Sequence, residues 1–481
     1  MKHPVLRICL LLLAVLIIGS VLVLRTLQPA DVPEEAESAA ADSTEPEPIP
    51  DEAAAPDTAS ESDAETPEEA PEGEPAPVTR TGVLLRLDGE ELTWLPDDGT
   101  EETLSLADAA LSAPETLYQG YPVTLTFDAA GSLLSAEISD FSALTAEEAA
   151  QNILKTLSTE EKVGQLFLAR YPDQNAAETA ARLHLGGYIL FGRDFSGLTA
   201  EEVQAKTAAV QAASTLPMLL AVDEEGGTVC RVSSNTALRA AGRFASPQEL
   251  YAAGGLEAIA ADTTEKCSLL SSLGLNVNMA PVCDVSQDAN DFIYKRSFGR
   301  SAAETAEYVR TVVETMQGTG VGCVLKHFPG YGNNTDTHTG IAYDHRSYDT
   351  FTSSDFLPFS AGIAAGAGAV LVSHNIVDCM DPDRPASLSA EVHRILREEL
   401  GFTGVAITDD LAMDAIGDYC GSEAAAVQAV LAGNDLLCCT DFETQLPAVL
   451  AAVQDGTISQ GRLDEAAGRV LCWKVQLGLF S

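Results

Sequence analysis

Charged and histidine side chains follow several apolar runs of this 481-residue sequence, at the point where each run ends. Asp223 follows one such run and Asp409 another, while Lys326 and His327 close a third. Carboxylates and imidazoles transfer protons, and together with a lysine they can hold hydroxyl groups. If these side chains converge in the fold, the pattern favours acid–base chemistry on a polyhydroxylated ligand.

Each of these residues also has a purely structural alternative. A lone Asp after a strand is often the N-cap of a helix. His374 is either a packed residue or a ligand contact. The grouping is the stronger signal, because buried charges are costly unless they are paired. The remaining residues in comparable positions are Asp284, Asp410 and Asp435.

The apolar runs alternate with segments of helical periodicity over residues 141–481. Continuous apolar strands, each followed by a helix, are typical of a parallel sheet covered by helices. Eight such units predict a (β/α)₈ TIM barrel, an α/β fold whose chemistry lies at the carboxyl ends of the strands. The expected strands are Val163–Ala169, Gly187–Phe191, Met218–Val222, Val277–Pro281, Cys323–Phe328, Ala369–Ser373, Val405–Thr408 and Asp435–Cys439.

The most specific motif is Lys-His-Phe-Pro-Gly-Tyr-Gly at 326–332, followed by Asp-Thr-His at 336–338. Here the sequence resembles glycoside hydrolase family 3, in its β-N-acetylhexosaminidase branch. Seven further motifs agree in order, and the resemblance covers about residues 145–481. These motifs are LSTEEKVGQLF from 157, GGYILFGR from 186, AVDEEGGTVCR from 221, NMAPVCDV from 278, RSFG from 296, PASLS from 385 and TDDLAM from 408.

The resemblance implies catalysis by double displacement, with retention of configuration. Asp409 would be the nucleophile that attacks the anomeric carbon. His338 would act first as general acid and then as general base, and Asp336 would orient it and stabilise its charged form. A histidine with an unperturbed pKa of ~6.5 can give and take a proton near neutral pH, and a neighbouring carboxylate raises that pKa.

The resemblance also implies a set of sugar-binding residues. Asp410 would be a supporting residue or a helix cap. The sequence departs from the branch at Tyr331, where His is common, and in the loop at 333–335, which is one residue shorter than expected. Four residues match positions that hold the hydroxyls of the terminal sugar in the family, namely Asp223, Arg296, Lys326 and His327. If His338 is not the acid, the alternatives are Glu224, Glu225 and His374.

The expected substrate is a terminal β-linked N-acetylglucosamine, and peptidoglycan fragments are its plausible source. Relatives of the β-glucosidase type usually carry a second α/β domain with an acid/base Glu, whereas this sequence ends at Ser481 after one last helical segment. No cofactor and no metal is expected, because no Cys or His spacing matches a metal site. Phosphorolysis, β-glucosidase-type specificity and an inactive barrel that binds wall sugars stay open as alternatives.

Residues 1–30 predict a membrane anchor. The segment Ile8–Leu24 has 17 residues without a charge, with Lys2 and Arg7 before it and Arg25 after it. That length is near the lower limit for a membrane-spanning helix, ~17–25 residues. Positive charge before the helix keeps the N-terminus inside. We therefore expect a single-pass cell-membrane protein with an extracytoplasmic catalytic domain, or a secreted one if the N-terminus is cleaved.

Residues 31–78 predict an acidic tether. They contain 17 Asp and Glu, nine Pro and no Lys or Arg, a composition that is unable to bury enough apolar surface to fold. The whole chain has 72 acidic and 27 basic residues and a net charge of −45. A field of that sign repels phosphate backbones, which excludes nucleic acid as an expected partner.

Residues 79–140 predict a small antiparallel β module, to which we assign no chemistry. The short runs 82–87, 92–95 and 123–127 are rich in strand-forming residues, with turn signals such as Asp-Gly between or after them. The module contains no Cys and no His. The barrel that follows is expected to be monomeric.

Overall fold

The computed structural model describes residues 76–334 and 340–481 of the chain. The predicted anchor (1–30), nearly all of the predicted tether (31–78), and the proposed dyad of Asp336 and His338 lie outside the described residues. No helix within the described ranges is long and apolar enough to cross a membrane.

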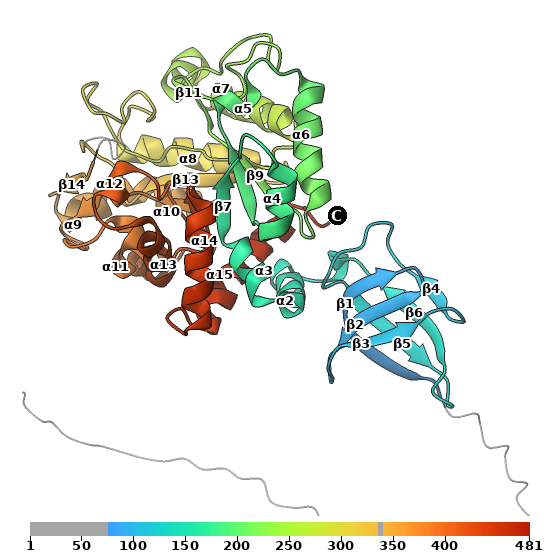
Figure 1. Cartoon of the computed structure of the whole chain (residues 1–481). Helices are drawn as coiled ribbons and strands as arrows, with labels where there is room; N and C mark the ends of the chain where they lie inside the picture. Colours follow the sequence, from blue (N-terminus) through green and yellow to red (C-terminus); the bar gives the residue numbers. More distant parts are fainter. Residues whose placement is uncertain (1–75, 335–339) are drawn as a thin grey trace, which may run out of the picture. The chain divides into compact units, whose positions relative to one another are not determined.

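Residues 78–138 form a six-stranded sheet in the order β3-β2-β1-β5-β6-β4 (Figure 1). Alternate side chains of its strands are buried, including Leu92, Trp94, Val123 and Leu125. The expectation of an antiparallel module needs one correction, since β4 pairs with β6 in parallel. The three-residue β4 is too short for its sequence to show a strand pattern. The strands are β1 (Val78–Asp88), β2 (Glu91–Pro96), β3 (Glu102–Ser105), β4 (Ala110–Ser112), β5 (Pro122–Phe127) and β6 (Leu133–Ile138).

The remaining residues form an α/β fold around an eight-stranded parallel sheet. Its order is β17-β15-β13-β12-β9-β8-β7-β18, and a parallel bridge between Ile407 and Leu436 joins the two edges, so the sheet is nearly closed into a barrel. Its strands are β7 (Phe167–Arg170), β8 (Gly187–Leu190), β9 (Leu219–Val222), β12 (Val277–Asn278), β13 (Gly322–Phe328), β15 (Ala369–Val372), β17 (Val405–Thr408) and β18 (Leu437–Cys439). Two short ribbons pair β10 (Glu224–Gly226) with β11 (Val229–Cys230), and β14 (Tyr343–Asp344) with β16 (Ile376–Val377).

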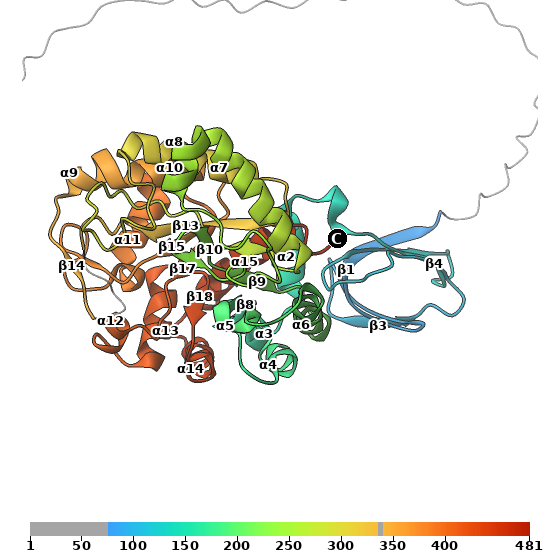
Figure 2. The same ribbon diagram turned by 90° about the horizontal axis from the view of Figure 1, so that it is seen from above.

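Helices surround the strands, as Figures 1 and 2 show. Helices α2, α3, α6, α7 and α8 each begin with a capping box in which a Ser or Thr and the Glu three residues later satisfy the first backbone N–H groups. The helices are α2 (Ala146–Thr156), α3 (Thr159–Gln165), α4 (Ala176–Leu183), α5 (Gly192–Phe195), α6 (Ala200–Ala213), α7 (Pro247–Ser272), α8 (Ala302–Met316), α9 (Tyr348–Thr350), α10 (Phe356–Ala364), α11 (Ala390–Arg394), α12 (Asp414–Gly417), α13 (Ser422–Ala432), α14 (Phe442–Gln454) and α15 (Gln460–Gln476).

The expected first strand, Val163–Ala169, was wrong in its first half. The capping box of Ser158 and Glu161 starts α3, which continues to Gln165, and only then does β7 begin at Phe167. Val163 is fully buried in the helix, just as it would be in a strand. A short buried apolar run has no periodicity that distinguishes the two.

Successive side chains along each strand point alternately into the barrel and towards the covering helices, which gives two apolar clusters. Residues such as Leu168, Ala221, Val324 and Ile407 belong to one compact cluster to which all eight strands contribute, the filling of the barrel. Their strand neighbours, such as Phe167, belong to the larger cluster that includes the covering helices. Because side chains alternate with a period of two, the residue two positions beyond the last barrel-filling side chain points to the barrel mouth.

Candidate active site

The barrel mouth carries the predicted residues. Counting two positions on from the barrel-filling residues Leu168, Ile189, Ala221, Val324, Ile407 and Cys438 gives one layer of side chains at the carboxyl ends of the strands. Sequence analysis singled out three members of this layer, Asp223, Lys326 and Asp409. From these six strands the layer contains Arg170, Phe191, Asp223, Lys326, Asp409 and Thr440.

Lys326 is the centre of a buried charge cluster. Its side chain is only 2% exposed, and its Nζ lies 2.7 Å from Asp223 Oδ1 and 2.6 Å from Glu225 Oε1. Burial alone would lower the pKa of Lys326, but the two carboxylates outweigh this effect and raise it. The lysine is therefore charged at the working pH, and its ammonium group fixes the position of Asp223.

Arg296 and Glu225 form the second half of this cluster. Arg296 donates to Glu225 through Nε at 3.0 Å and through Nη2 at 2.7 Å, a two-pronged pair. Burial alone would raise the pKa of Glu225, but Arg296 and Lys326 hold it far below its usual range. Glu225 is thus a permanent anion that joins the two cations, so it has no proton to give as a general acid.

His327 is held in one orientation by residues from two other parts of the chain. Its Nδ1 lies 2.7 Å from Asp284 Oδ2, and its Nε2 lies 3.1 Å from Arg296 Nη2. Because arginine only donates, Nε2 accepts, and the ring proton on Nδ1 is donated to Asp284. Asp284 also accepts from the backbone N–H groups of His327 and Tyr331, at 3.2 and 2.7 Å.

Asp409 directly follows β17 and is partly exposed at the mouth. Its backbone N–H donates to Val372 O at 3.1 Å, and its Oδ1 accepts from the Asp410 N–H at 2.9 Å. Asp410 points elsewhere, since its carboxylate accepts from the backbone N–H and the hydroxyl of Thr440 at 3.1 and 2.5 Å. Asp410 thus fastens the end of β17 to the end of β18.

Two alternative acids have structural roles. His374 is fully buried, accepting at Nδ1 from Ser387 Oγ at 2.7 Å and donating from Nε2 to Asp410 O at 3.1 Å. Glu224 is fully buried too, and it accepts from the backbone N–H of Arg231 at 2.9 Å and from the Ser233 hydroxyl. Both side chains are engaged in these buried hydrogen bonds.

Sequence analysis gave no binding role to two residues that organise the site, Glu225 and Asp284. Glu225 lies two positions after Asp223 in the motif AVDEEGG, and Asp284 follows the expected strand at 277–281. Both residues could be recognised in the sequence as carboxylates close to the ends of predicted strands. Their partners, Arg296 and His327, lie 71 and 43 residues away in the sequence.

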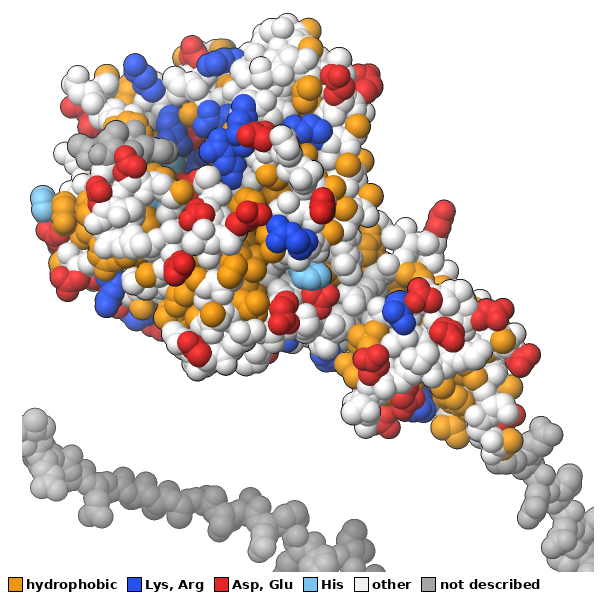
Figure 3. All heavy atoms as spheres, in the orientation of Figure 1, with side chains coloured by type: hydrophobic (Ala, Val, Ile, Leu, Met, Phe, Trp, Pro, Cys, Tyr) orange, Lys and Arg blue, Asp and Glu red, His pale blue; other side chains and the backbone are white. Residues whose placement is uncertain are grey.

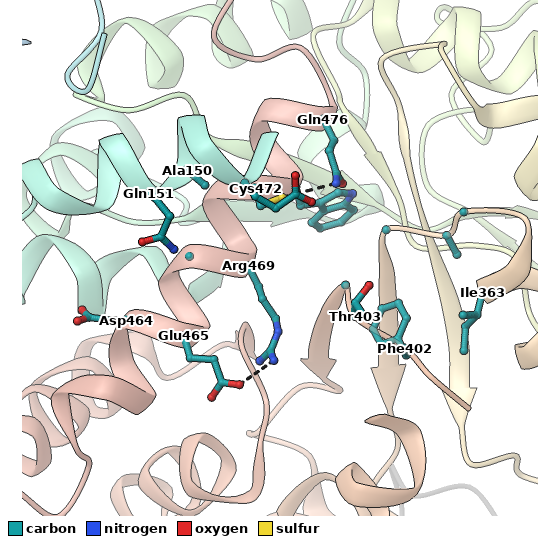
Figure 4. Close-up of a pocket in the computed structure, with 17 residues that line it drawn as sticks. Ala150, Gln151, Ile363, Phe402, Thr403, Asp464, Glu465, Arg469, Cys472 and Gln476 are labelled. Atoms are coloured by element: carbon teal, nitrogen blue, oxygen red, sulfur yellow. Dashed lines mark hydrogen bonds and ion pairs between the residues drawn. The ribbon is translucent and has the colours of Figure 1, made fainter. Parts of the chain in front are cut away.

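A large cavity lies at the other end of the barrel (Figure 4). It has a volume of about 490 Å³ and is lined by Gly368 and Gly404, which precede β15 and β17, and by Arg469 and Trp473 of α15. It shares no residue with the charge cluster. Within the described residues, no group of three His, Cys, Asp or Glu side chains could hold a metal ion.

Comparison with known proteins assigns the chain to a family. Residues 158–472 match the sequence profile described as the glycosyl hydrolase family 3 N terminal domain. The chain belongs to glycoside hydrolase family 3. This family 3 chain is 34% identical over 288 residues to a β-hexosaminidase of Xanthomonas campestris, covering 59% of this chain and 86% of that protein.

Solved structures agree with this assignment. A family 3 β-N-acetylglucosaminidase from Paenibacillus sp. str. FPU-7 superposes with a TM-score of 0.63 at 32% identity, over 68% of this chain and 64% of that one. A β-N-acetylhexosaminidase from Beutenbergia cavernae gives a TM-score of 0.58 at 31% identity, over 66% and 98%. This family 3 member is therefore a glycoside hydrolase of the β-N-acetylhexosaminidase branch.

Proposed function

We propose that the chain is a retaining exo-hydrolase that removes terminal β-linked N-acetylglucosamine, with Asp409 as nucleophile. The observation that carries the proposal is the joint position of Asp223, Lys326 and Asp409 in one layer at the barrel mouth. Two carboxylates and a fixed ammonium group, beside a partly buried arginine and a buried histidine, fit a sugar ring better than an apolar ligand. The relatives named above are β-hexosaminidases, which favours a 2-acetamido sugar.

Sugar binding is assigned to the charge cluster. Asp223 is 16% exposed, so its carboxylate can accept from two ring hydroxyls while Lys326 holds its other side. Arg296 presents donors on a neighbouring side of the same space, where it also donates to the ring of His327. Because their partners already fix these side chains, they lose little conformational freedom when the sugar binds.

The chemistry would proceed in two balanced steps. In the first, Asp409 attacks the anomeric carbon, the glycosidic C–O bond breaks, and His338 gives its proton to the leaving oxygen. In the second, His338 takes a proton from water, the water oxygen bonds to the anomeric carbon, and the ester bond to Asp409 breaks. Asp336 would hold the imidazole in orientation for both proton transfers.

The test is the replacement Asp409→Asn. Turnover of an aryl β-N-acetylglucosaminide should fall by several orders of magnitude, while the melting temperature stays within a few degrees of the parent. A 2-deoxy-2-fluoro glycoside with a good leaving group should add its sugar mass to the peptide that contains Asp409. Labelling of another peptide, or near-normal turnover by the variant, would remove Asp409 from this role.

We also propose that the barrel works outside the cell, on fragments of peptidoglycan, and that residues 1–30 anchor it. The motivation is the charge-free segment Ile8–Leu24 with Lys2 and Arg7 before it, and the acidic segment after it. External protease added to cells without an outer barrier should cut within 31–78 and release an active barrel. Complete protection of the barrel would contradict this topology.

A further inference from the structure

Two arginines lie against one aromatic ring beside the proposed sugar site. The guanidinium carbon of Arg170 lies 4.9 Å from the centroid of the Phe191 ring, and that of Arg231 lies 5.8 Å from it. The Nε atoms of both arginines are buried without a hydrogen-bond partner. Neither guanidinium makes an ion pair or a hydrogen bond to any residue that the structure describes. Their Nη groups are not among the buried atoms, so they reach solvent.

The position of this pair is the barrel mouth. Arg170 is two residues beyond Leu168, and Phe191 is two residues beyond Ile189, so both point the same way as Asp223 and Asp409. Phe191 packs against the barrel-filling cluster. The backbone N–H of Arg231 donates to Glu224, the residue after Asp223. Figure 3 shows Lys and Arg side chains gathered on the barrel domain where β11 lies in Figure 1, and Arg231 directly follows β11.

The lack of a carboxylate partner is unusual for this chain. The sequence has 72 acidic residues for 27 basic ones. Every other guanidinium that stacks on an aromatic ring in the described ranges also pairs with a carboxylate, for example Arg80 with Glu102, Arg239 with Glu265 and Arg397 with Asp435. A partly buried arginine without a counter-ion is costly, and an anionic ligand would offset that cost.

We propose that Arg170 and Arg231 bind an oxyanion that enters the mouth together with the sugar. This proposal rests on the proposed function, because it makes the two arginines part of the site beyond the terminal sugar. The oxyanion is either a carboxylate carried by the leaving saccharide or inorganic phosphate. Guanidinium groups suit both, since they donate two parallel hydrogen bonds to a pair of oxygens.

The first arm of the test compares two disaccharides with N-acetylglucosamine at the non-reducing end. One has a carboxylate on the leaving sugar, and the other has the methyl ester of that carboxylate. The parent enzyme should prefer the acid in kcat/KM by about 10-fold or more, the usual effect of a charged hydrogen bond. Arg170→Met and Arg231→Met should each bring the ratio towards unity. Arg80→Met, which removes a stacked and paired arginine of the β module, should leave the ratio unchanged.

The second arm adds inorganic phosphate to the hydrolysis of an aryl β-N-acetylglucosaminide. If phosphate is the bound oxyanion, one of its oxygens attacks the anomeric carbon of the glycosyl-enzyme, the ester bond to Asp409 breaks, and N-acetylglucosamine 1-phosphate forms. That product should appear with the parent and decrease strongly with Arg170→Met. An acid preference without this product assigns the site to the carboxylate of the leaving sugar, and the reverse result assigns it to phosphate.

Calorimetry keeps this inference separate from the proposed function. The acid, its methyl ester and inorganic phosphate are titrated into Asp409→Asn with Arg170 intact and into the same variant with Arg170→Met. Weaker binding of the acid or of phosphate after Arg170→Met supports the oxyanion site even if no hydrolysis is found in the parent. If Arg170→Met and Arg231→Met change neither the acid-to-ester ratio, nor the phosphate response, nor binding, the oxyanion site does not exist.

Discussion

Glu225 binds Arg296 through two parallel hydrogen bonds and touches Lys326 Nζ with one of the same oxygens, Oε1. One buried carboxylate therefore joins two cations that come from separate parts of the chain. Arg296 also donates to His327. The arrangement makes Glu225 the common support of three side chains to which sugar binding is assigned.

Replacing this support should reduce both stability and sugar binding. Glu225→Gln leaves the buried Lys326 and the partly buried Arg296 with less negative charge, and breaking a buried pair costs about 3–5 kcal/mol. We expect a lower melting temperature and a rise of KM by about 10-fold or more. The control is Glu265→Gln, which removes a 55% exposed partner of Arg239 and should change stability by less than about 1 kcal/mol. A variant of Glu225 with the KM of the parent would contradict the assigned role.

The role of His338 can be tested by the leaving group. General acid–base catalysis contributes ~10²–10⁴-fold, and only a poor leaving group needs protonation. His338→Ala should therefore lower kcat/KM by about that factor on a disaccharide and much less on a nitrophenyl glycoside. Its kcat on the activated substrate should also fall, and azide should restore it by replacing water in the second step.

Asp336→Asn should show a weaker version of the same pattern, because Asp336 acts through His338. An equal loss on both leaving groups, with no effect of azide, would make His338 a binding or structural residue. The acid would then have to come from another group, since Glu224, Glu225 and His374 are all committed to buried contacts.

Arg346 ties together the two flanks of the segment 335–339. It donates to Gly330 O at 2.9 Å before the segment and to Asp344 Oδ2 at 2.7 Å after it. Asn334 donates to the same Asp344 oxygen at 2.8 Å. Gly332 lies so close that a β-carbon there would be 2.4 Å from the guanidinium carbon of Arg346.

Arg346→Gln should therefore affect the acid more than the nucleophile. We expect kcat/KM to fall at least about 10-fold more on a disaccharide than on a nitrophenyl glycoside, since the flanks would no longer be held together. Arg394→Gln removes an arginine that pairs with Glu391 on the surface, and it serves as the control. The same loss on both substrates would indicate a purely structural role for Arg346.

Lys474 makes stability depend on pH. It is fully buried, its Nζ lies 2.6 Å from Gln165 Oε1, and burial lowers its pKa to about 7. An unfolded lysine has a pKa of ~10.4, so between about pH 7 and 10 the unfolded chain binds more protons than the folded one. As the pH falls through that window, protonation of Lys474 in the unfolded chain lowers the free energy of unfolding by up to ~1.4 kcal/mol per pH unit.

Lys474→Met should remove this dependence. Denaturant unfolding at pH 7 and at pH 9 should show a smaller gain in the free energy of unfolding with rising pH than the parent shows. Lys155→Met, on the exposed side of α2, is the control and should differ from the parent by less than about 0.5 kcal/mol. An unchanged slope in Lys474→Met would mean that Lys474 keeps its proton across this range.

Local pattern explains which parts of the fold were predictable. Six of the eight predicted barrel strands lie within a residue or two of the observed ones, because buried parallel strands have continuous apolar runs. The strand predicted from Val163 was wrong in its first half, because a capping box, a local signal, starts a helix at Thr159 that continues into the run as far as Gln165. The prediction of a wholly antiparallel module missed the parallel pairing of β4 with β6. The direction of pairing depends on the path of the chain between the two strands, and the three residues of β4 carry no information about that path.

The sequence by itself determined that Asp223, Lys326, His327 and Asp409 lie near the carboxyl ends of their strands, and parallel strands of one barrel end at one mouth. Only the tertiary structure decided which of them touch. The pairing of Glu225 with Arg296, and the position of Arg170 and Arg231 against Phe191, depend on which side chains face the mouth once the sheet closes. Distances between residues tens of positions apart are set by packing, because local periodicity carries no information about them.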